Sequence, residues 1–196
     1  AIFEQEKWLI MRLIRRKIDD FLKEWTENEE RLPLIVKGAR QIGKTASIMQ
    51  FANDNYKNVV AINFVLQQKF KSIFDDGYDV DSVVRNITLI DPSIELEPGN
   101  TIFFFDEMQD CPVCATSLKA FKIDGRYDVV CSGSLMGINY QEIESNSVGY
   151  KEDYTMHSMD FEEFLWAKGY DSAFVERLFE KMVSVTPLSS LEMDGL

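Results

Sequence analysis

The feature that most constrains the fold of this chain is a glycine-containing segment, KGARQIGKT, which runs from Lys37 to Thr45. Gly38, four intervening residues and then Gly43-Lys44-Thr45 have the spacing of a P-loop. The apolar run at 34–36 predicts a buried strand before this loop, and residues 45–52 predict a helix after it. A strand, a glycine loop and a helix in this order favour an α/β fold with a parallel sheet.

Each part of the loop has a physical role in binding a nucleoside triphosphate. Backbone N–H groups must curl around the phosphates, and side chains at the glycine positions would block that approach. We expect Lys44 to reach the β- and γ-phosphates and the Thr45 hydroxyl to ligate Mg²⁺, with the positive end of the following helix near the anion. The predicted nucleotide-binding residues are Gly38, Ala39, Arg40, Gln41, Ile42, Gly43, Lys44, Thr45 and Ala46.

Two carboxylates follow a second hydrophobic strand, predicted at 101–105 and expected to be covered on both faces. We expect Asp106 to hold Mg²⁺ and Glu107 to accept a proton from an attacking water, so that Glu107 and Lys44 are the predicted catalytic residues. The adjacent glutamate and the lack of an Asn-Lys-x-Asp tetrapeptide favour a hydrolysing ATPase over a regulatory GTPase. The alternative is a strand that simply turns polar at the surface.

Two serines end the strand predicted at 127–131. The carboxyl ends of parallel strands face the same crevice, so Ser132 or Ser134 is expected to sense the γ-phosphate or the attacking water. The sequence does not choose between them. The alternative is a turn whose hydroxyls cap the next segment.

The remaining pattern predicts strands alternating with helices, and therefore a mainly parallel sheet. Asp160, followed three residues later by Glu163, predicts a helix start. Four apolar residues after it are expected mostly to pack, with a shelf for a missing C-terminal part as the alternative: Phe161, Phe164, Leu165 and Trp166. The predicted domains are an N-terminal helical segment at 1–30, a core at 31–170 and the start of a truncated helical or lid region at 171–196. The other predicted elements are a helix at 4–25, strands at 59–64 and 154–159, and helical segments at 69–74, 80–89 and 115–121.

Composition excludes several classes of protein. The net charge of −12, from 33 acidic and 21 basic residues, argues against broad contact with nucleic acid but leaves a local patch open. The sequence has neither a long apolar run nor a signal peptide, and its three cysteines do not make a disulfide framework, so we expect a cytoplasmic protein without a membrane segment. Cys111 and Cys114 have metal-site spacing, but only Cys131 and His157 could complete a zinc site, so packing is the preferred interpretation.

The segments KGARQIGKT, FFFDEMQDCP, VVCSGSLMG and MDFEEFL, in this order, resemble the prokaryotic AAA+ family ATPases in which an AAA-type domain precedes a domain of unknown function. The resemblance runs from about Leu32 to the end of the chain. It implies a P-loop NTPase three-layer sandwich of the AAA+ type with a five-stranded sheet, and ATP and Mg²⁺ as ligands. It also implies Walker A and Walker B motifs at the two predicted sites and a sensor at Ser132–Ser134.

The chain departs from this family in two respects. It begins without methionine and ends at EMDGL, so we expect a piece of a longer polypeptide, whose missing C-terminal region would bind a protein client or nucleic acid. Related proteins, which can form homo-oligomers, often have an arginine finger where this chain has Tyr150. Lys151 lacks the planar fork of arginine, Arg40 lies inside the loop, and Arg126 precedes a strand at the wrong end of the sheet.

Two functions therefore remain open. The first is an ATPase module that drives a conformational change in a C-terminal effector region. The second is a nucleotide-dependent switch with negligible hydrolysis. Because loss of an arginine finger lowers rates by roughly 10³–10⁵-fold, slow turnover is expected. A P-loop kinase is a weaker third possibility, since no acceptor-site signature is visible.

Overall fold

The computed structural model describes residues 14–134 and 149–194. The chain divides into two compact units, one formed by Ile18–Ser158 and the other by Ala1–Lys17 together with Met159–Leu196. Each unit has its own cluster or clusters of buried apolar side chains.

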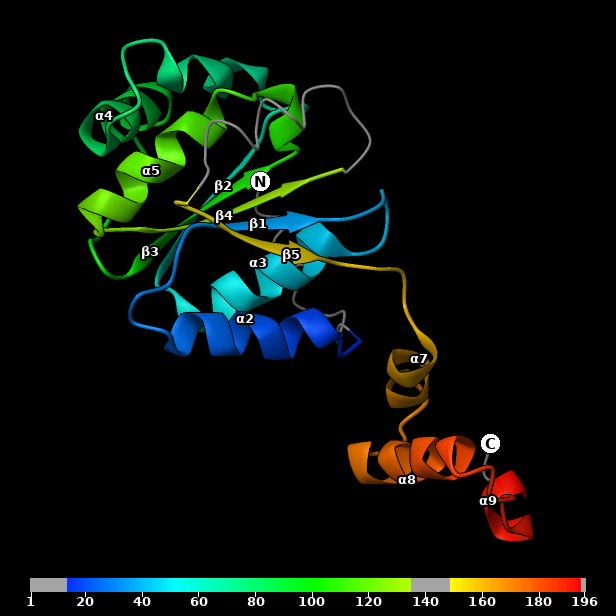
Figure 1. The fold of residues 1–196 in the computed structure, drawn as a ribbon. Helices are drawn as coiled ribbons and strands as arrows, with labels where there is room; N and C mark the ends of the chain where they lie inside the picture. Colours follow the sequence, from blue (N-terminus) through cyan, green and yellow to red (C-terminus); the bar gives the residue numbers. More distant parts are fainter. Residues whose placement is uncertain (1–13, 135–148, 195–196) are drawn as a thin grey trace. The chain divides into compact units, whose positions relative to one another are not determined.

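The unit Ile18–Ser158 is built on a five-stranded, all-parallel sheet with the order β2-β3-β4-β1-β5 (Figure 1). Because β1 lies between β4 and β5, the loop that leaves β1 starts beside the ends of strands from distant parts of the sequence. Open parallel sheets bind ligands at such positions. The strands are β1 (Leu34–Lys37), β2 (Asn58–Asn63), β3 (Thr101–Asp106), β4 (Asp128–Gly133) and β5 (Glu152–Thr155).

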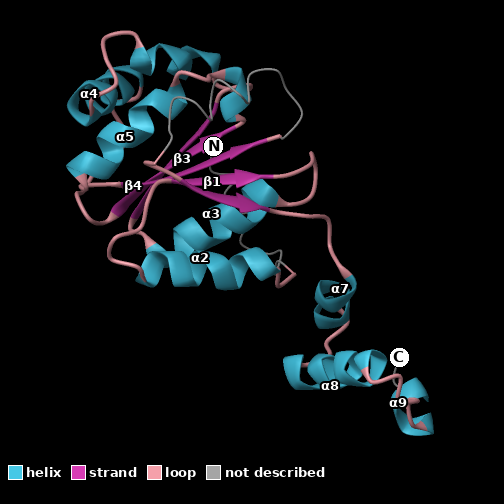
Figure 2. Cartoon of the chain, viewed as in Figure 1, coloured by secondary structure: helices cyan, strands magenta, loops and turns pink. Residues whose placement is uncertain are grey.

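Helices cover both faces of this sheet, giving three layers. Helices α4 and α5 lie on one face, and α2 and α3 lie on the other (Figures 1 and 2). This arrangement confirms the α/β fold class expected from the sequence. The helices are α2 (Lys17–Glu27), α3 (Lys44–Asn55), α4 (Val80–Ile90) and α5 (Cys114–Asp124), with two 3₁₀ segments, η1 (Gln68–Phe74) and η2 (Met108–Asp110).

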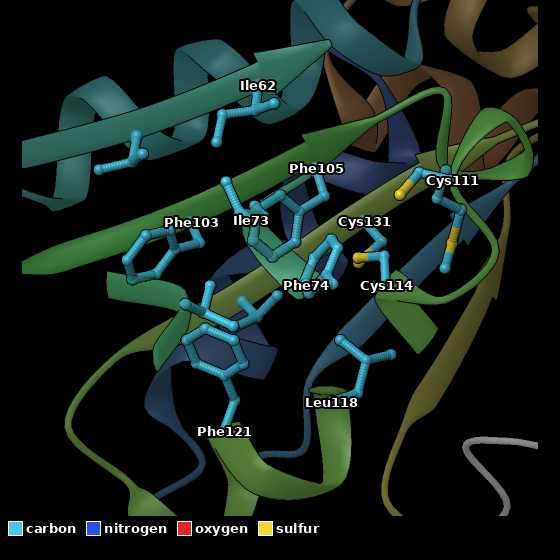
Figure 3. Packing of buried hydrophobic residues seen from close by; sticks show 14 of the residues in the cluster. Ile62, Ile73, Phe74, Phe103, Phe105, Cys111, Cys114, Leu118, Phe121 and Cys131 are labelled. Carbon is cyan, nitrogen blue, oxygen red and sulfur yellow. The ribbon is translucent and has the colours of Figure 1, made fainter. Parts of the chain in front are cut away.

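Strand β3, which lies between β2 and β4, is buried along its whole length, as its uninterrupted apolar run predicts. Phe103 and Phe105 belong to the apolar cluster that includes α4 and α5, whereas Ile102 and Phe104 belong to the cluster that includes α2 and α3 (Figure 3). Strand side chains alternate between faces, so a continuous apolar run serves both clusters. Each fully buried phenylalanine contributes roughly 1.5–3 kcal/mol of transfer free energy.

The three cysteines are also part of the core. Cys111, Cys114 and Cys131 are buried and lie in the cluster that includes α4 and α5 (Figure 3). Burial raises the pKa of the Cys111 thiol to about 11. Their packing role agrees with the preferred interpretation of the sequence.

Two expectations about element boundaries are corrected. The last strand is β5, Glu152–Thr155, two residues earlier than predicted at its start, and His157 lies beyond it. The helix expected at 4–25 is not continuous, because residues 14–16 are not helical and α2 begins at Lys17; residues 4–13 lie outside the described part of the chain.

The second unit contains three helices in its described part, namely α7 (Phe161–Ala167), α8 (Ser172–Val183) and α9 (Ser190–Asp194). Asp160 and Glu163 form the expected capping box. The Asp160 carboxylate accepts from the Glu163 N–H at 2.9 Å, and the Glu163 carboxylate accepts from the Asp160 N–H at 3.1 Å. Leu165 and Trp166 have the expected packing role, whereas Phe161 and Phe164 are 52% and 47% exposed. The small core of this unit is formed by Leu165, Val175 and Leu178.

Within residues 14–134 and 149–194, no helix combines the length and the hydrophobicity that crossing a membrane requires.

Candidate functional site

The glycine loop connects β1 to α3, as its sequence predicts, and two of its residues have left-handed backbone conformations. Gly43 has φ 98° and immediately precedes α3, and Gln41 has φ 63°. Glycine adopts positive φ without a steric penalty, which explains its presence directly before the helix. The first turn of α3 therefore presents its free N–H groups to the loop.

Lys44, the predicted phosphate-binding lysine, turns back into this loop. Its Nζ donates to the carbonyl oxygens of Gly38 at 3.0 Å and Ala39 at 2.7 Å, and the residue is buried. Burial lowers the pKa of the Lys44 ammonium, the nearby carboxylates of Glu107 and Asp106 oppose that shift, and the cation of Arg40 adds to it. The ammonium thus lies between the loop and the acidic end of β3.

Asp106 is the point at which the predicted site residues meet. Its Oδ2 accepts from the Thr45 hydroxyl at 3.1 Å and from the Asn63 side-chain amide at 2.9 Å. Its Oδ1 accepts from the Ser132 hydroxyl and, at 3.1 Å, from the Glu107 N–H. The helix after the glycine loop, β2 and β4 therefore each supply a donor to one buried carboxylate at the end of β3.

The two serines at the end of β4 occupy different environments, Ser132 within the strand and Ser134 directly after it. Ser132 is fully buried and contacts Asp106 directly, whereas Ser134 is partly exposed and its backbone N–H donates to the side chain of Gln109 at 3.3 Å. Ser132 is thus the serine that belongs to the hydrogen-bond group around Asp106.

Glu107, the predicted general base, is partly buried and has an unusual backbone. Its φ of 56° and ψ of 46° place it in the left-handed region at the start of η2, which costs a residue with a side chain roughly 1–2 kcal/mol. Its carboxylate accepts from the side-chain amide of Gln109.

The contacts of Asn63 and Gln109 were not predicted from the sequence. The parallel pairing of β2 and β3 places Asn63 opposite Asp106. A polar residue ending an apolar strand, as Asn63 does, is the sequence signal that could have identified it.

A cavity of about 720 Å³ lies against the glycine loop. Its lining residues include Gly38, Ala39, Arg40, Ser134, His157 and Ser158.

Arg126 lies near the opposite end of β4, where it pairs with Asp124 at 2.7 Å, as expected from its place in the sequence.

The donors beside the loop suit Mg²⁺. Mg²⁺ prefers oxygen ligands and is usually held by one or two protein groups together with phosphates and water. The Thr45 hydroxyl and the Asp106 carboxylate are oxygen donors 3.1 Å apart. In the described residues, no group of three or more histidine, cysteine, aspartate and glutamate side chains forms a separate metal site.

Family comparison agrees with this fold. The model of a family described as AAA domain matches residues 30–165, so the chain belongs to the AAA domain family. This membership makes it a nucleotide-binding, ATPase-like module. A protein of Haemophilus influenzae described only as uncharacterized is 24% identical over 188 residues, which are 94% of this chain and 42% of that protein. The chain therefore spans less than half the length of this relative.

Solved structures of similar fold include C. elegans PCH-2, at 12% identity and a TM-score of 0.43 over 89% of this chain and 48% of that one. Thermotoga maritima RuvB, a Holliday junction branch migration motor, is 13% identical with a TM-score of 0.43, over 72% of this chain and 45% of that one. Aeropyrum pernix ORC1, solved in complex with DNA, is 13% identical with a TM-score of 0.43, over 71% of this chain and 43% of that one.

Proposed function

We propose that this protein binds ATP with Mg²⁺ at the glycine loop and hydrolyses it. The observation that carries the proposal is the meeting of Thr45 and Ser132 on the Asp106 carboxylate, beside Lys44. Three segments distant in sequence supply a hydroxyl, a carboxylate and an ammonium to one edge of the sheet. That combination matches the chemistry of a metal-bound polyphosphate.

In this proposal Lys44 exchanges partners when nucleotide binds. Its ammonium donates to two backbone carbonyls of the loop. Phosphate oxygens carry full negative charge and form stronger hydrogen bonds to an ammonium than neutral carbonyls do. Lys44 therefore binds the β- and γ-phosphates, and the N–H groups of residues 38–46 bind the remaining phosphate oxygens.

Thr45 and Asp106 hold Mg²⁺ in this proposal, and Ser132 fixes the orientation of Asp106. When bound, the metal neutralises charge on the phosphates. Because Asp106 already accepts from four donors, its carboxylate has a fixed orientation before nucleotide arrives. The serines at the end of β4 respond to the γ-phosphate, and Ser132 does so from a buried position in contact with Asp106.

Glu107 is the proposed general base that takes a proton from the attacking water. Its carboxylate follows Asp106 directly in the chain and raises the pKa of Lys44, which places negative charge close to that ammonium. Positioned general bases contribute roughly 10²–10⁴-fold to rates. We therefore expect Glu107→Gln to lower the rate of phosphate release by at least about 100-fold while ATP binding is retained.

The test is phosphate release from ATP and Mg²⁺ by the purified protein, with Glu107→Gln and Lys44→Ala measured in parallel. Lys44→Ala should lose nucleotide binding, which separates a binding defect from a catalytic one. An unchanged rate in Glu107→Gln would contradict the assignment of the base.

A nucleotide-dependent switch with negligible hydrolysis is the second candidate, and Tyr150 favours it. The ring of Tyr150 lies under the Lys119 ammonium, 4.8 Å from its Nζ, at the position where an arginine finger was expected. Single-turnover measurement distinguishes the two functions, because a switch keeps bound ATP intact for hours.

In either case, we propose that this module is part of a larger protein and acts on another region of it. The aligned region covers 42% of the Haemophilus influenzae relative, and the family resemblance leads us to place an effector region on the carboxyl side of this module. ATP binding and hydrolysis change the conformation of that region, and self-association would supply catalytic groups from a neighbouring copy. Light scattering with and without ATP tests the self-association.

A further inference from the structure

The contacts of Gln109 join Glu107 to the end of β4. Gln109 lies in η2, two residues after Glu107, and its Nε2 donates to the Glu107 carboxylate. Its Oε1 accepts from the backbone N–H of Ser134 at 3.3 Å. One partly buried amide thus connects the proposed base to the backbone that follows the buried serine.

The two ends of the amide satisfy these two contacts. The Glu107 carboxylate can only accept, so it requires the NH₂ group, and the Ser134 N–H can only donate, so it requires the carbonyl oxygen. A glutamate at position 109 would offer no donor to Glu107 and would add a second negative charge. The chemistry of the two partners therefore fixes the orientation of the amide.

The neighbouring glycine leaves room for this amide. A Cβ at Gly133 would lie 2.9 Å from Gln109 Oε1 and 3.4 Å from Met108 Cγ. The first distance is shorter than a Cβ normally shows, so any side chain at position 133 would displace the amide. Close packing on one side and two directed hydrogen bonds on the other restrict the rotamers of Gln109.

The base needs such a support because its backbone alone does not hold the carboxylate. Glu107 has a left-handed conformation, and its side chain has several rotatable bonds beyond that strained backbone. A catalytic group must be held near its productive geometry by neighbours whose own positions are fixed. Charge-assisted hydrogen bonds are the stronger class available for this purpose.

We propose that Gln109 is the positioning residue for Glu107 and that it couples the orientation of the base to the backbone at Ser134. This inference rests on the proposed function, since it assumes that Glu107 acts as the base. When the end of β4 responds to the γ-phosphate, the amide of Gln109 transmits that response to the carboxylate. Gln109 itself does not contact the reacting atoms.

Gln109→Met is the main test, because methionine keeps the length of the side chain and removes the hydrogen bonds of the amide to Glu107 and Ser134, together with a longer one to the Asp110 carboxylate at 3.4 Å. We expect kcat for ATP hydrolysis to fall by about tenfold or more, a part of the 10²–10⁴-fold due to a positioned base. The Kd for ATP should stay within about twofold, because Gln109 lies outside the glycine loop. Gln50→Met, the same substitution at an exposed position on α3, is the matched control and should keep the wild-type kcat.

A double-mutant comparison separates positioning from a general structural defect. If Gln109 acts through Glu107, then Gln109→Met should change the residual rate of the Glu107→Gln protein by less than about twofold, since residues that act as a unit are not additive. Gly133→Ala, which displaces the amide from the other side, should reproduce the fall in kcat with ATP affinity retained. Gly133 has no positive φ, so the alanine meets no backbone penalty.

The possible outcomes distinguish failure of the positioning role from failure of the proposed ATPase activity. A wild-type kcat in Gln109→Met, or an equal fall in both backgrounds, overturns the positioning role and leaves the proposed ATPase intact. A wild-type protein that binds ATP without hydrolysing it overturns the ATPase and the positioning role together. A loss of kcat in Gln109→Met that disappears in the Glu107→Gln background supports both.

Discussion

Gly38 is the residue at which the loop and the sheet come closest together. Its φ is 156°, and a Cβ there would lie 2.4 Å from the carbonyl oxygen of Met156 and 2.7 Å from Ile42 Cδ1. The first of these atoms is backbone and is fixed by the hydrogen bond from the Met156 N–H to the Lys37 carbonyl at 2.7 Å. An added methyl group would have to move either the loop or the chain after β5.

We therefore expect Gly38→Ala to lower the free energy of unfolding by roughly 2–4 kcal/mol, since both an overpacked contact and an unfavourable φ contribute. Urea denaturation measures this loss. Gly99→Ala is the control, because Gly99 also has a positive φ of 78° but a Cβ added there would meet no atom within 4 Å. A Gly38→Ala protein no less stable than Gly99→Ala would show that the loop accommodates the methyl group.

At the same scale, the sequence predicted some site contacts and missed others for a physical reason. Lys44, Thr45 and Asp106 were predicted from local spacing within two motifs, and the structure brings Thr45 and Asp106 within hydrogen-bonding distance. Asn63 belongs to neither motif, and Gln109, although it lies in the FFFDEMQDCP segment, was given no role from the sequence. Their contacts depend on strand register and on a bent backbone, which a single sequence does not encode in any fixed spacing.

At the scale of elements, strands buried on both faces were predicted most accurately. β1 and β3 are continuous apolar runs flanked by turns, and they lie within one residue of their predicted bounds. β5 was misplaced because it pairs with β1 alone and its residues, EDYT, alternate between partly buried and exposed. Such a polar edge strand lacks the apolar pattern on which the prediction depended.

The stability of the short helix α9 should depend on pH. Glu192 accepts from the Lys181 ammonium of α8 at 2.6 Å and from the Ser189 hydroxyl at 2.6 Å. These hydrogen bonds lower the pKa of Glu192 from its ordinary 4.5 to about 2. A carboxyl whose pKa is depressed by folding stabilises the fold above pH 4.5 and loses that contribution as the pH falls towards 2.

We expect α9 to lose protection against hydrogen exchange between pH 4.5 and about 2 in the wild-type protein. In Glu192→Gln, protection should already be reduced at neutral pH and should change less across this range, because the ionised partner of Lys181 is absent. Identical profiles for the two proteins would show that this carboxylate does not hold α9.

At the scale of the whole molecule, the two compact units should respond differently to nucleotide. All the residues proposed to bind ATP and Mg²⁺ lie in the unit Ile18–Ser158, and α7, α8 and α9 lie in the other. A ligand stabilises only the cooperative unit whose folded form binds it. Hydrogen exchange can therefore locate the binding site without relying on catalysis.

We expect ATP with Mg²⁺ at about 100 times its Kd to stabilise this unit by about 2.7 kcal/mol, a rise in melting temperature of roughly 5–10 °C. Slower exchange should appear in residues 38–46 and at the end of β3, and not in α8. Removing Mg²⁺ with a chelator should reduce the effect, because Thr45 and Asp106 would then have no metal to share with the phosphates. Lys44→Ala should abolish it, whereas equal protection of both units in the wild-type protein would place nucleotide binding elsewhere.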